Sequence, residues 1–101
     1  MKQMDQDPVI TGGTRRLAFE NDRARVLDVN LTPGGKVAMH SHPGYIVIPL
    51  DKGCKVRYTS PDGKEEQAEI KSGEPLWREA GSHSIENIGR TECHVLRLEF
   101  K

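Results

Sequence analysis

Short segments of alternating apolar and polar residues follow one another along the whole chain. In residues 92–100 (ECHVLRLEF), the even-numbered residues share one face and the odd-numbered residues share the other, as in a β-strand with two different environments. No interval between turn signals is long and regular enough to predict an amphipathic helix. The segments with β character are 14–19, 24–31, 36–42, 45–50, 54–59, 65–70, 75–79 and 92–100.

The spacing of the turns predicts the fold class. Glycine, proline and asparagine–aspartate signals recur between the segments at short intervals. Six to nine short strands joined by tight turns are typical of a β-sandwich or barrel, and 101 residues are enough for one such domain. We therefore predict a single all-β domain, with an N-terminal arm at 1–14 and a β-barrel at 15–101.

One segment, YIVIPL at 45–50, is apolar on both faces. Such a strand should be covered on both sides, by the barrel interior and by a neighbouring sheet or subunit. A homodimer is the simplest cover for the outer face. An ordinary central strand of a closed sandwich explains the pattern equally well.

Charge and composition narrow the choice of partners. The chain has 15 Lys plus Arg against 15 Asp plus Glu, so its formal net charge is zero. Nucleic acid and anionic membrane are therefore not expected partners, because both need a local excess of positive charge. No apolar run has the length of a signal peptide or reaches the roughly 20 residues of a spanning helix, so we expect a cytoplasmic protein.

The two cysteines, Cys54 and Cys93, could pair with each other. Because the expected compartment keeps thiols reduced, we predict two free thiols. Neither cysteine lies in a CxxC or CxH pattern, which argues against a zinc site built on thiolates.

The stretch MHSHPGY, residues 39–45, places two imidazoles on one face of a strand. With a rise of roughly 3.3 Å per residue, the Cβ atoms of His40 and His42 lie about 6 to 7 Å apart, and both rings can reach one metal ion. His83, which follows the loop signal EAGSH, is the better third ligand. His94 lies among Leu and Phe and is expected to be a hydrogen-bonded core residue. The alternative for His40 and His42 is a surface or hydrogen-bonded pair.

Glycines around these histidines add a family resemblance. Gly34, His40, His42 and Gly53 fit the pattern G(x)5HxH(x)3-4E(x)6G, and Gly73, Gly81, His83 and Asn87 nearly fit G(x)5PxG(x)2H(x)3N. These are the two motifs of the cupin superfamily, which the chain resembles over residues 15–100. The resemblance implies a cupin-type jelly-roll barrel, a double-stranded β-helix that is often dimeric, with the motif histidines facing inward. Residues 61–89 look most like the short single-domain cupins linked with β-alanine and small-acid catabolism.

The sequence departs from this pattern where the family supplies a carboxylate ligand. Ile46 occupies that position, Glu79 replaces the proline of the second motif, and the following loop is one residue short. The resemblance therefore implies a ligand set of His40, His42 and His83 alone. Imidazole suits zinc, iron or nickel better than manganese, and no organic cofactor is expected.

Three functions remain open. The first is a metal-dependent enzyme that acts on a small carboxylic acid by dioxygenase-like or by isomerase or lyase chemistry. The second is a cupin that binds a small ligand without metal, with Ile46 as a wall of the pocket. The third is a structural dimer whose site has degenerated. A fold alone does not decide among them.

Other residues receive structural interpretations. Trp77 is expected in the core, and Tyr45 is expected to point away from the site because it neighbours Ile46. Arg97 and Glu99 share a strand face and are expected to be a solvated or interface pair. Glu79 and Glu86, which could replace the missing carboxylate, are interpreted as solvated strand-edge residues.

Overall fold

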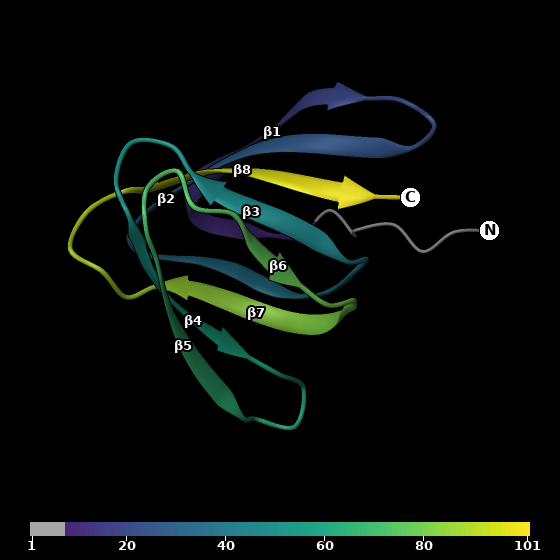
Figure 1. Cartoon of the computed structure of the whole chain (residues 1–101). Helices are drawn as coiled ribbons and strands as arrows, with labels where there is room; N and C mark the ends of the chain where they lie inside the picture. The colour runs from purple at the N-terminus through teal and green to yellow at the C-terminus, as the bar shows by residue number, and fades with distance from the viewer. Residues whose placement is uncertain (1–7) are drawn as a thin grey trace.

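The computed structural model describes residues 8–101, which form eight β-strands (Figure 1). They are β1 (Ile10–Glu20), β2 (Ala24–His42), β3 (Tyr45–Pro49), β4 (Cys54–Thr59), β5 (Glu65–Ile70), β6 (Leu76–Arg78), β7 (Gly81–Asn87) and β8 (Cys93–Phe100). The predicted all-β class is confirmed. Within the described residues, no helix is long and apolar enough to cross a membrane.

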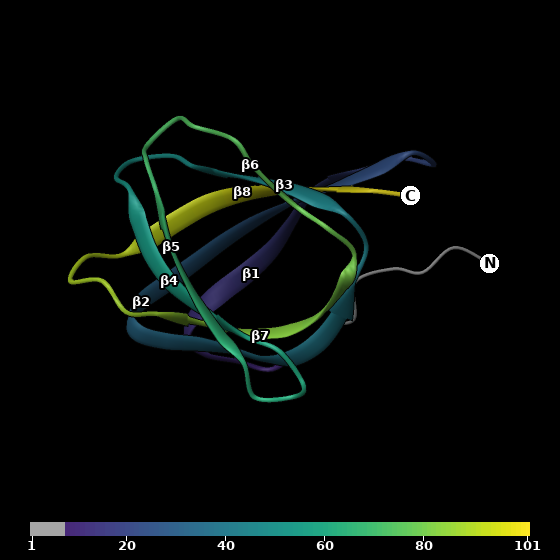
Figure 2. The ribbon, with the colours of Figure 1, turned by 60° about the horizontal axis from the view of Figure 1, so that its bottom comes forward.

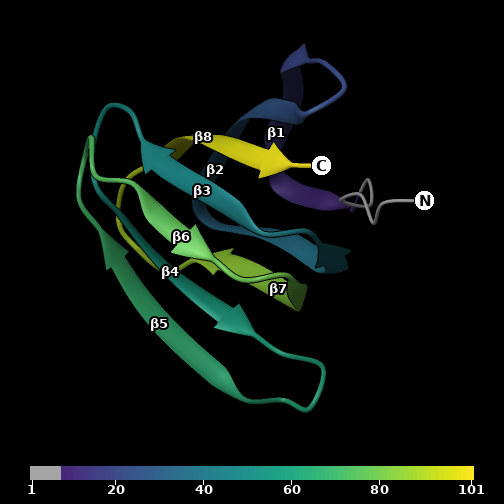
Figure 3. The ribbon, with the colours of Figure 1, turned by 45° about the vertical axis from the view of Figure 1, so that its right-hand side comes forward.

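The strands form one antiparallel sheet that curls around a common interior, as the view in Figure 2 shows. The order is β5-β4-β7-β2-β8-β3-β6, with β1 paired to β2 beside this path. The β4–β5 hairpin and the β1–β2 hairpin lie on opposite sides of the molecule (Figures 1 and 3). The single-domain jelly roll expected from the sequence is therefore the observed architecture.

The first strand begins at Ile10, before residue 15, where the barrel was expected to start. Ile10 pairs with Val37, and Thr11 pairs with Lys36. Residues 10–14 of the predicted arm thus belong to the sheet. Residues 1–7 lie outside the described residues.

Strand β2 is long because the turn expected at residues 33–35 is a bend within one strand. Its first half, Ala24 to Leu31, pairs with β8, and its second half, from Lys36 to His42, pairs with β7. Gly34 has a φ of 82°, and a Cβ on Gly35 would overlap the backbone of β1. The bend therefore requires glycine. It directs the end of β2 to a position beside β7, where His40 lies opposite His83.

Strand β8 buries the face opposite to the one that the sequence favoured. The odd-numbered residues face the interior, whereas His94 lies on the outer face. His94 is hydrogen-bonded as expected, to Asp28 and Asp51, but it is not a core residue. Alternation along a strand defines two faces without telling which one is inside, which is why this prediction was wrong.

Arg97 and Glu99 are also buried, which corrects the expectation of a solvated or interface pair. Glu99 has 0% exposure and Arg97 has 6%. Glu99 accepts hydrogen bonds from Arg25 at 2.9 and 3.1 Å, and its other carboxylate oxygen lies 3.1 Å from Arg97 Nε. A carboxylate between two guanidinium groups can be buried because its charge is compensated.

The two cysteines form a disulfide, contrary to the predicted free thiols. Cys54 and Cys93 are the first residues of β4 and β8, and their Cα atoms are 5.2 Å apart. Both belong to the hydrophobic core, together with residues such as Leu27, Val56 and Val95. Sequence spacing could not reveal the pair, because the curled sheet brings the two strand ends together.

Candidate functional site

The three predicted histidines meet inside the barrel. His40 and His42 lie near the end of β2, and His83 lies on β7, in a segment that the sequence analysis treated as a loop. His40 and His83 are Cα partners in the β2–β7 ladder. The ring centroids of His42 and His83 are 4.2 Å apart, those of His40 and His83 4.9 Å, and those of His40 and His42 5.8 Å. All three side chains are buried.

Backbone carbonyl groups fix which ring nitrogen of His40 and His42 carries the proton. His40 Nδ1 lies 2.8 Å from the Ala38 carbonyl oxygen, and His42 Nδ1 lies 2.8 Å from the Pro43 carbonyl oxygen. Since a carbonyl oxygen only accepts, each Nδ1 donates. In the neutral rings the lone pair then resides on Nε2, the arrangement by which histidine commonly binds a metal ion.

The third ring, His83, is neutral at any pH near 7. Burial is the largest cause that lowers its pKa, to about 2, and the neighbouring His42 and His40 lower it further. Its Nε2 is buried and has no hydrogen-bond partner among the described residues. His83 is therefore in the form that ligates a metal at any pH near neutral.

Two tyrosines that were not predicted from the sequence to be part of the site surround the histidines. The ring of Tyr45 stands edge-on to His42 with centroids 5.1 Å apart, and that of Tyr58 stacks on His83, also at 5.1 Å. The two phenols are hydrogen-bonded to each other, and burial raises the pKa of each. They remain neutral hydroxyl groups beside the histidines.

The inward position of Tyr45 corrects the expectation that it points away. The corner at Pro43 and Gly44 separates β2 from β3, so alternation counted from His42 does not continue into β3. Ile46 is therefore on the outer face, where it pairs with Trp77 and Leu98, and it does not wall the site. Trp77 is 48% exposed and is not a core residue.

The carboxylates considered as replacements are engaged elsewhere. Glu79 accepts a hydrogen bond from Trp77 Nε1 at 2.6 Å, and Glu86 accepts one from Arg57 at 3.2 Å. Across residues 8–101, no group of three or more His, Cys, Asp or Glu side chains is arranged to hold a metal ion. The fit to a metal thus rests on the donor chemistry of three neutral imidazoles, whose rings would have to turn toward a common point.

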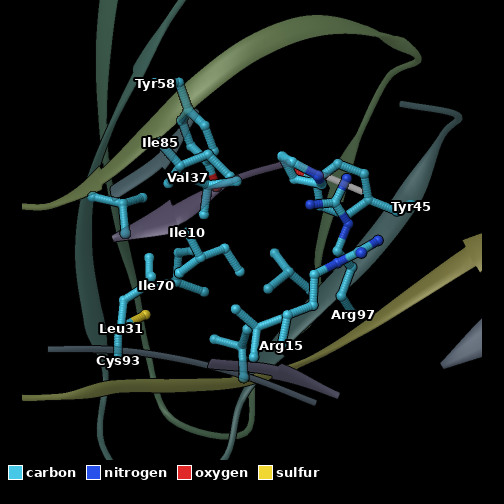
Figure 4. Close-up of a pocket in the computed structure, with 15 residues that line it drawn as sticks. Ile10, Arg15, Leu31, Val37, Tyr45, Tyr58, Ile70, Ile85, Cys93 and Arg97 are labelled. Carbon is cyan, nitrogen blue, oxygen red and sulfur yellow. The ribbon is translucent and has the colours of Figure 1, made fainter. Parts of the chain in front are cut away.

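Two cavities lie near the histidines, and the outer one is lined by two of them, whereas the inner one is not. The outer one has a volume of about 450 Å³ and is lined by His42 and His83 together with the Arg78–Glu66 ion pair. The inner one, about 50 Å³, lies within the barrel and is drawn in Figure 4. Tyr58 lines both cavities and Tyr45 lines the inner one, so the phenol rings stand between the inner cavity and the histidines.

Comparison with known proteins gives structural but no sequence relatives. No model of a protein family matches the sequence, and no curated protein matches it. Among solved structures, the chain is similar to a cupin domain from Bordetella pertussis Tohama I, with a TM-score of 0.79 and 25% identity. This similarity covers 100% of the chain and 98% of that domain.

Two enzymes have similar folds at lower identity. A polyketide cyclase from Streptomyces resistomycificus has a TM-score of 0.68 and 20% identity, over 94% of this chain and 69% of that one. An oxalate decarboxylase from Lactobacillus farciminis, solved as a formate complex, has a TM-score of 0.69 and 19% identity. That similarity covers 100% of this chain but 33% of the decarboxylase.

Proposed function

The chain has the fold of a single-domain cupin, and we propose that His40, His42 and His83 hold one divalent transition metal ion that acts on a small carboxylic acid. The observation that carries this proposal is the convergence of three buried imidazoles from two strands. Buried histidines that serve only packing do not need to gather in this way.

The ligand chemistry selects among metals. Three imidazoles without a carboxylate suit zinc, iron or nickel, whereas manganese prefers oxygen ligands. Three neutral ligands also leave the double positive charge of the ion uncompensated inside the barrel, so the affinity should be lower than in a site that includes a carboxylate. Three-histidine zinc sites with an open position for water occur in carbonic anhydrase.

When bound, such an ion supplies Lewis-acid or oxygen chemistry at an open coordination position. The residues of the chain supply the surroundings. Tyr45 and Tyr58 present neutral hydroxyl groups, and the one that does not donate to the other can donate a hydrogen bond to a carboxylate or to an oxygen of the substrate. Arg97 packs 3.9 Å from the centre of the Tyr45 ring and holds that ring in place.

The reaction class is dioxygenase-like, or an isomerisation or lyase step, on a small carboxylic acid. The similar folds of an oxalate decarboxylase and a polyketide cyclase support this choice, because they show enzymes built on the same architecture. Their identity to this chain is low, so the support comes through the fold.

A second candidate function is the binding of a small ligand without metal. It is favoured by the absence, within residues 8–101, of a ready-made ligand arrangement, and by the cavity inside the barrel. Under this alternative the histidines and tyrosines act as hydrogen-bonding groups for the ligand.

Titration with cobalt(II), whose visible absorption reports coordination number, tests the proposal. We expect the cobalt absorption to saturate at one equivalent of metal and to indicate a low coordination number. The absorption should change when a small anion is added and enters the open coordination position. The His83→Ala variant should lose the spectrum, and Arg16→Gln, an exposed change on β1, should keep it. Absence of a cobalt spectrum in the wild-type protein would favour the metal-free alternative.

A further inference from the structure

A charged side chain lies where the outer cavity meets the histidines. Arg78, the last residue of β6, lines this cavity together with His42 and His83. Its guanidinium carbon is 4.0 Å from the centre of the Tyr58 ring, and the same ring stacks on His83 with centroids 5.1 Å apart. The guanidinium group is therefore within about 9 Å of the His83 ring, the sum of these two distances. A small molecule in the cavity can reach both groups.

Strand pairing directs the Arg78 side chain inward. Arg78 is the Cα partner of Tyr45 in the β3–β6 ladder, and Glu66 is the Cα partner of Tyr58 in the β4–β5 ladder. Directly paired residues project from the same face of a sheet, so Arg78 and Glu66 share the inner face with the two tyrosines. Because β5 and β6 are at opposite ends of the strand order, the ion pair between Arg78 and Glu66 joins two edges of the sheet in the wall of the outer cavity.

The carboxylate that faces Arg78 is held loosely. The contacts from Arg78 to Glu66 measure 3.3 to 3.4 Å, longer than the roughly 2.7–2.9 Å of a strong charge-assisted hydrogen bond. The Glu66 side chain is 63% exposed, whereas that of Arg78 is 21% exposed. Ion pairs with an exposed member contribute little to stability, and water can hydrate the released carboxylate. Glu66 can therefore leave while Arg78 stays packed on Tyr58.

The other two carboxylates that line the outer cavity within the described residues have donors of their own. Glu79 accepts a hydrogen bond from Trp77 Nε1, and Glu65 lies 3.7 Å from Arg57. A ligand that takes the place of the loosely held carboxylate replaces one negative charge by another. Its binding therefore needs no excess of positive charge in the cavity.

A ligand displaces Glu66 only if it gains a contact that Glu66 lacks. The Nε2 atom of His83 is buried without a hydrogen-bond partner within residues 8–101, and His83 lines the same cavity. A hydroxyl group can donate to this atom or accept from it, so it fits either tautomer of the ring. The cavity volume of about 450 Å³ lies in the range of small-molecule sites and leaves room for an acid of about three or four carbons.

We propose that Arg78 is the specificity-determining residue of the outer cavity and binds the carboxylate of a small hydroxy acid, which displaces Glu66. The hydroxyl group of the acid then faces His83. Guanidinium suits this role because its planar donors match a carboxylate while its face stays on the Tyr58 ring. The inference rests on the proposed function for the reaction that follows, whereas the binding step is measured without turnover.

The two members of the ion pair provide the test, because their removal should act in opposite directions. Isothermal titration with lactate as the probe measures binding to protein dialysed against chelator and to protein reloaded with zinc. Arg78→Gln should weaken lactate binding at least about tenfold, the loss expected for a charged hydrogen bond. Glu66→Gln should strengthen it about two- to fivefold, because the competing carboxylate is removed. Lactamide, which has nearly the same shape without the charge, should not bind.

The control is Arg16→Gln, which removes an exposed ion pair on β1 and should change the lactate affinity less than about twofold. Because Glu66 is exposed, Glu66→Gln keeps the test valid even if Arg78→Gln fails to fold. A purely structural ion pair predicts that Arg78→Gln and Glu66→Gln both weaken binding or that neither changes it, and either result would overturn the inference. Equal binding of lactamide, or no binding of lactate to either form of wild type, would overturn it as well.

The same titrations separate this inference from the metal proposal. Opposite shifts in Arg78→Gln and Glu66→Gln in chelator-treated protein would support the inference even if the histidines hold no metal. Zinc that binds at one equivalent, with a lactate affinity that neither variant changes, would overturn the inference and leave the proposed function intact.

Discussion

The imidazole rings of His42 and His83 lie with their centroids 4.2 Å apart and their planes inclined by 34°. The two residues come from neighbouring strands, and both side chains are buried. Two buried rings at this separation cannot both be protonated, because like charges repel strongly where water is excluded. At least one ring of the pair is therefore in the neutral form that binds metal ions, and His83, whose pKa is lowered to about 2 by burial first of all, is that ring.

Replacing Glu99 by Gln should destabilise the protein strongly. The variant removes the carboxylate between Arg25 and Arg97 and leaves the partly buried guanidinium group of Arg25 close to the buried one of Arg97. We expect a loss of about 3–5 kcal/mol in the free energy of unfolding, measured by urea denaturation. The matched control is Glu20→Gln, which breaks an exposed ion pair with Lys101 and should cost far less. If both variants lowered the free energy of unfolding by the same small amount, the buried ion pair would contribute no more to stability than the exposed one.

The disulfide between Cys54 and Cys93 should stabilise the oxidised protein. Its sequence separation is 39, and closing a loop of that length restricts the unfolded chain by about 4 kcal/mol. Urea denaturation with and without reductant compares two forms of one sequence, so packing of the sulfur atoms is nearly constant. The Cys54→Ala/Cys93→Ala variant is the control and should not respond to reductant. A wild-type protein that ignores reductant would show that the thiols are not joined in solution.

His94 should make stability depend on pH. Its two ring nitrogens face Asp51 at 3.0 Å and Asp28 at 2.8 Å, and Arg16 also contacts Asp28. The hydrogen bonds to Asp51 and Asp28 raise the pKa of His94 above its usual 6.5. A raised pKa in the folded state stabilises the protein fully below the pKa of the unfolded chain, and this contribution disappears as pH rises through the folded-state pKa.

We therefore expect His94→Gln to cost more stability at pH 5.5 than at pH 9. Because the side chain is partly exposed, the difference should be below about 1 kcal/mol. Denaturant unfolding of wild type and variant at the two pH values measures it, and Asp51→Asn should reduce the same pH dependence. An identical pH dependence in wild type and His94→Gln would contradict this prediction.

The outer face of the sheet carries a row of apolar residues that predicts a homodimer. Phe19, Val26, Leu98, Ile46 and Trp77 are successive cross-strand partners on β1, β2, β8, β3 and β6. The rings of Trp77 and the nearby Phe100 are 6.2 Å apart. A second copy of the chain can place the same row against this one in a two-fold contact, which is the commonest way to cover such a face.

Light scattering during size-exclusion chromatography measures the oligomeric state. We expect a dimer for wild type and a folded monomer for Leu98→Glu, because the added charge would be buried in the contact. Met39→Glu, an equally large change at an exposed apolar position away from the row, should stay dimeric. A wild-type monomer, or a dimeric Leu98→Glu variant, would contradict the predicted contact.

The sequence predicted the histidine cluster better than its surroundings. Alternation placed His40 and His42 on one face, and motif spacing added His83 from another strand. Both signals are local in the sequence. The pairing of β2 with β7 brings the three histidines together in one site. The bend of β2, which makes this pairing possible, lies at Pro33-Gly34-Gly35, a signal that in the sequence alone predicts a turn between two strands.

The tyrosines, the buried ion pair and the disulfide could not be predicted in the same way. The corner at Pro43 and Gly44 shifts the alternation, so Tyr45 rather than Ile46 faces the histidines. Alternation divides β8 into two faces. The face that carries Glu99 lies inside, where Arg25 from β2 donates a hydrogen bond to Glu99. These features depend on which distant strands become neighbours, and a single strand does not carry that information.

The most direct test of the account is the metal content of protein purified without a histidine tag and without chelator. Elemental mass spectrometry of wild type should give close to one equivalent of zinc, iron or nickel per chain. The His40, His42 and His83 to Ala variant, shown to be folded by its melting curve, should contain almost none. Metal far below one equivalent in wild type, unchanged in the variant and not restored by reconstitution, would contradict the proposed three-histidine centre.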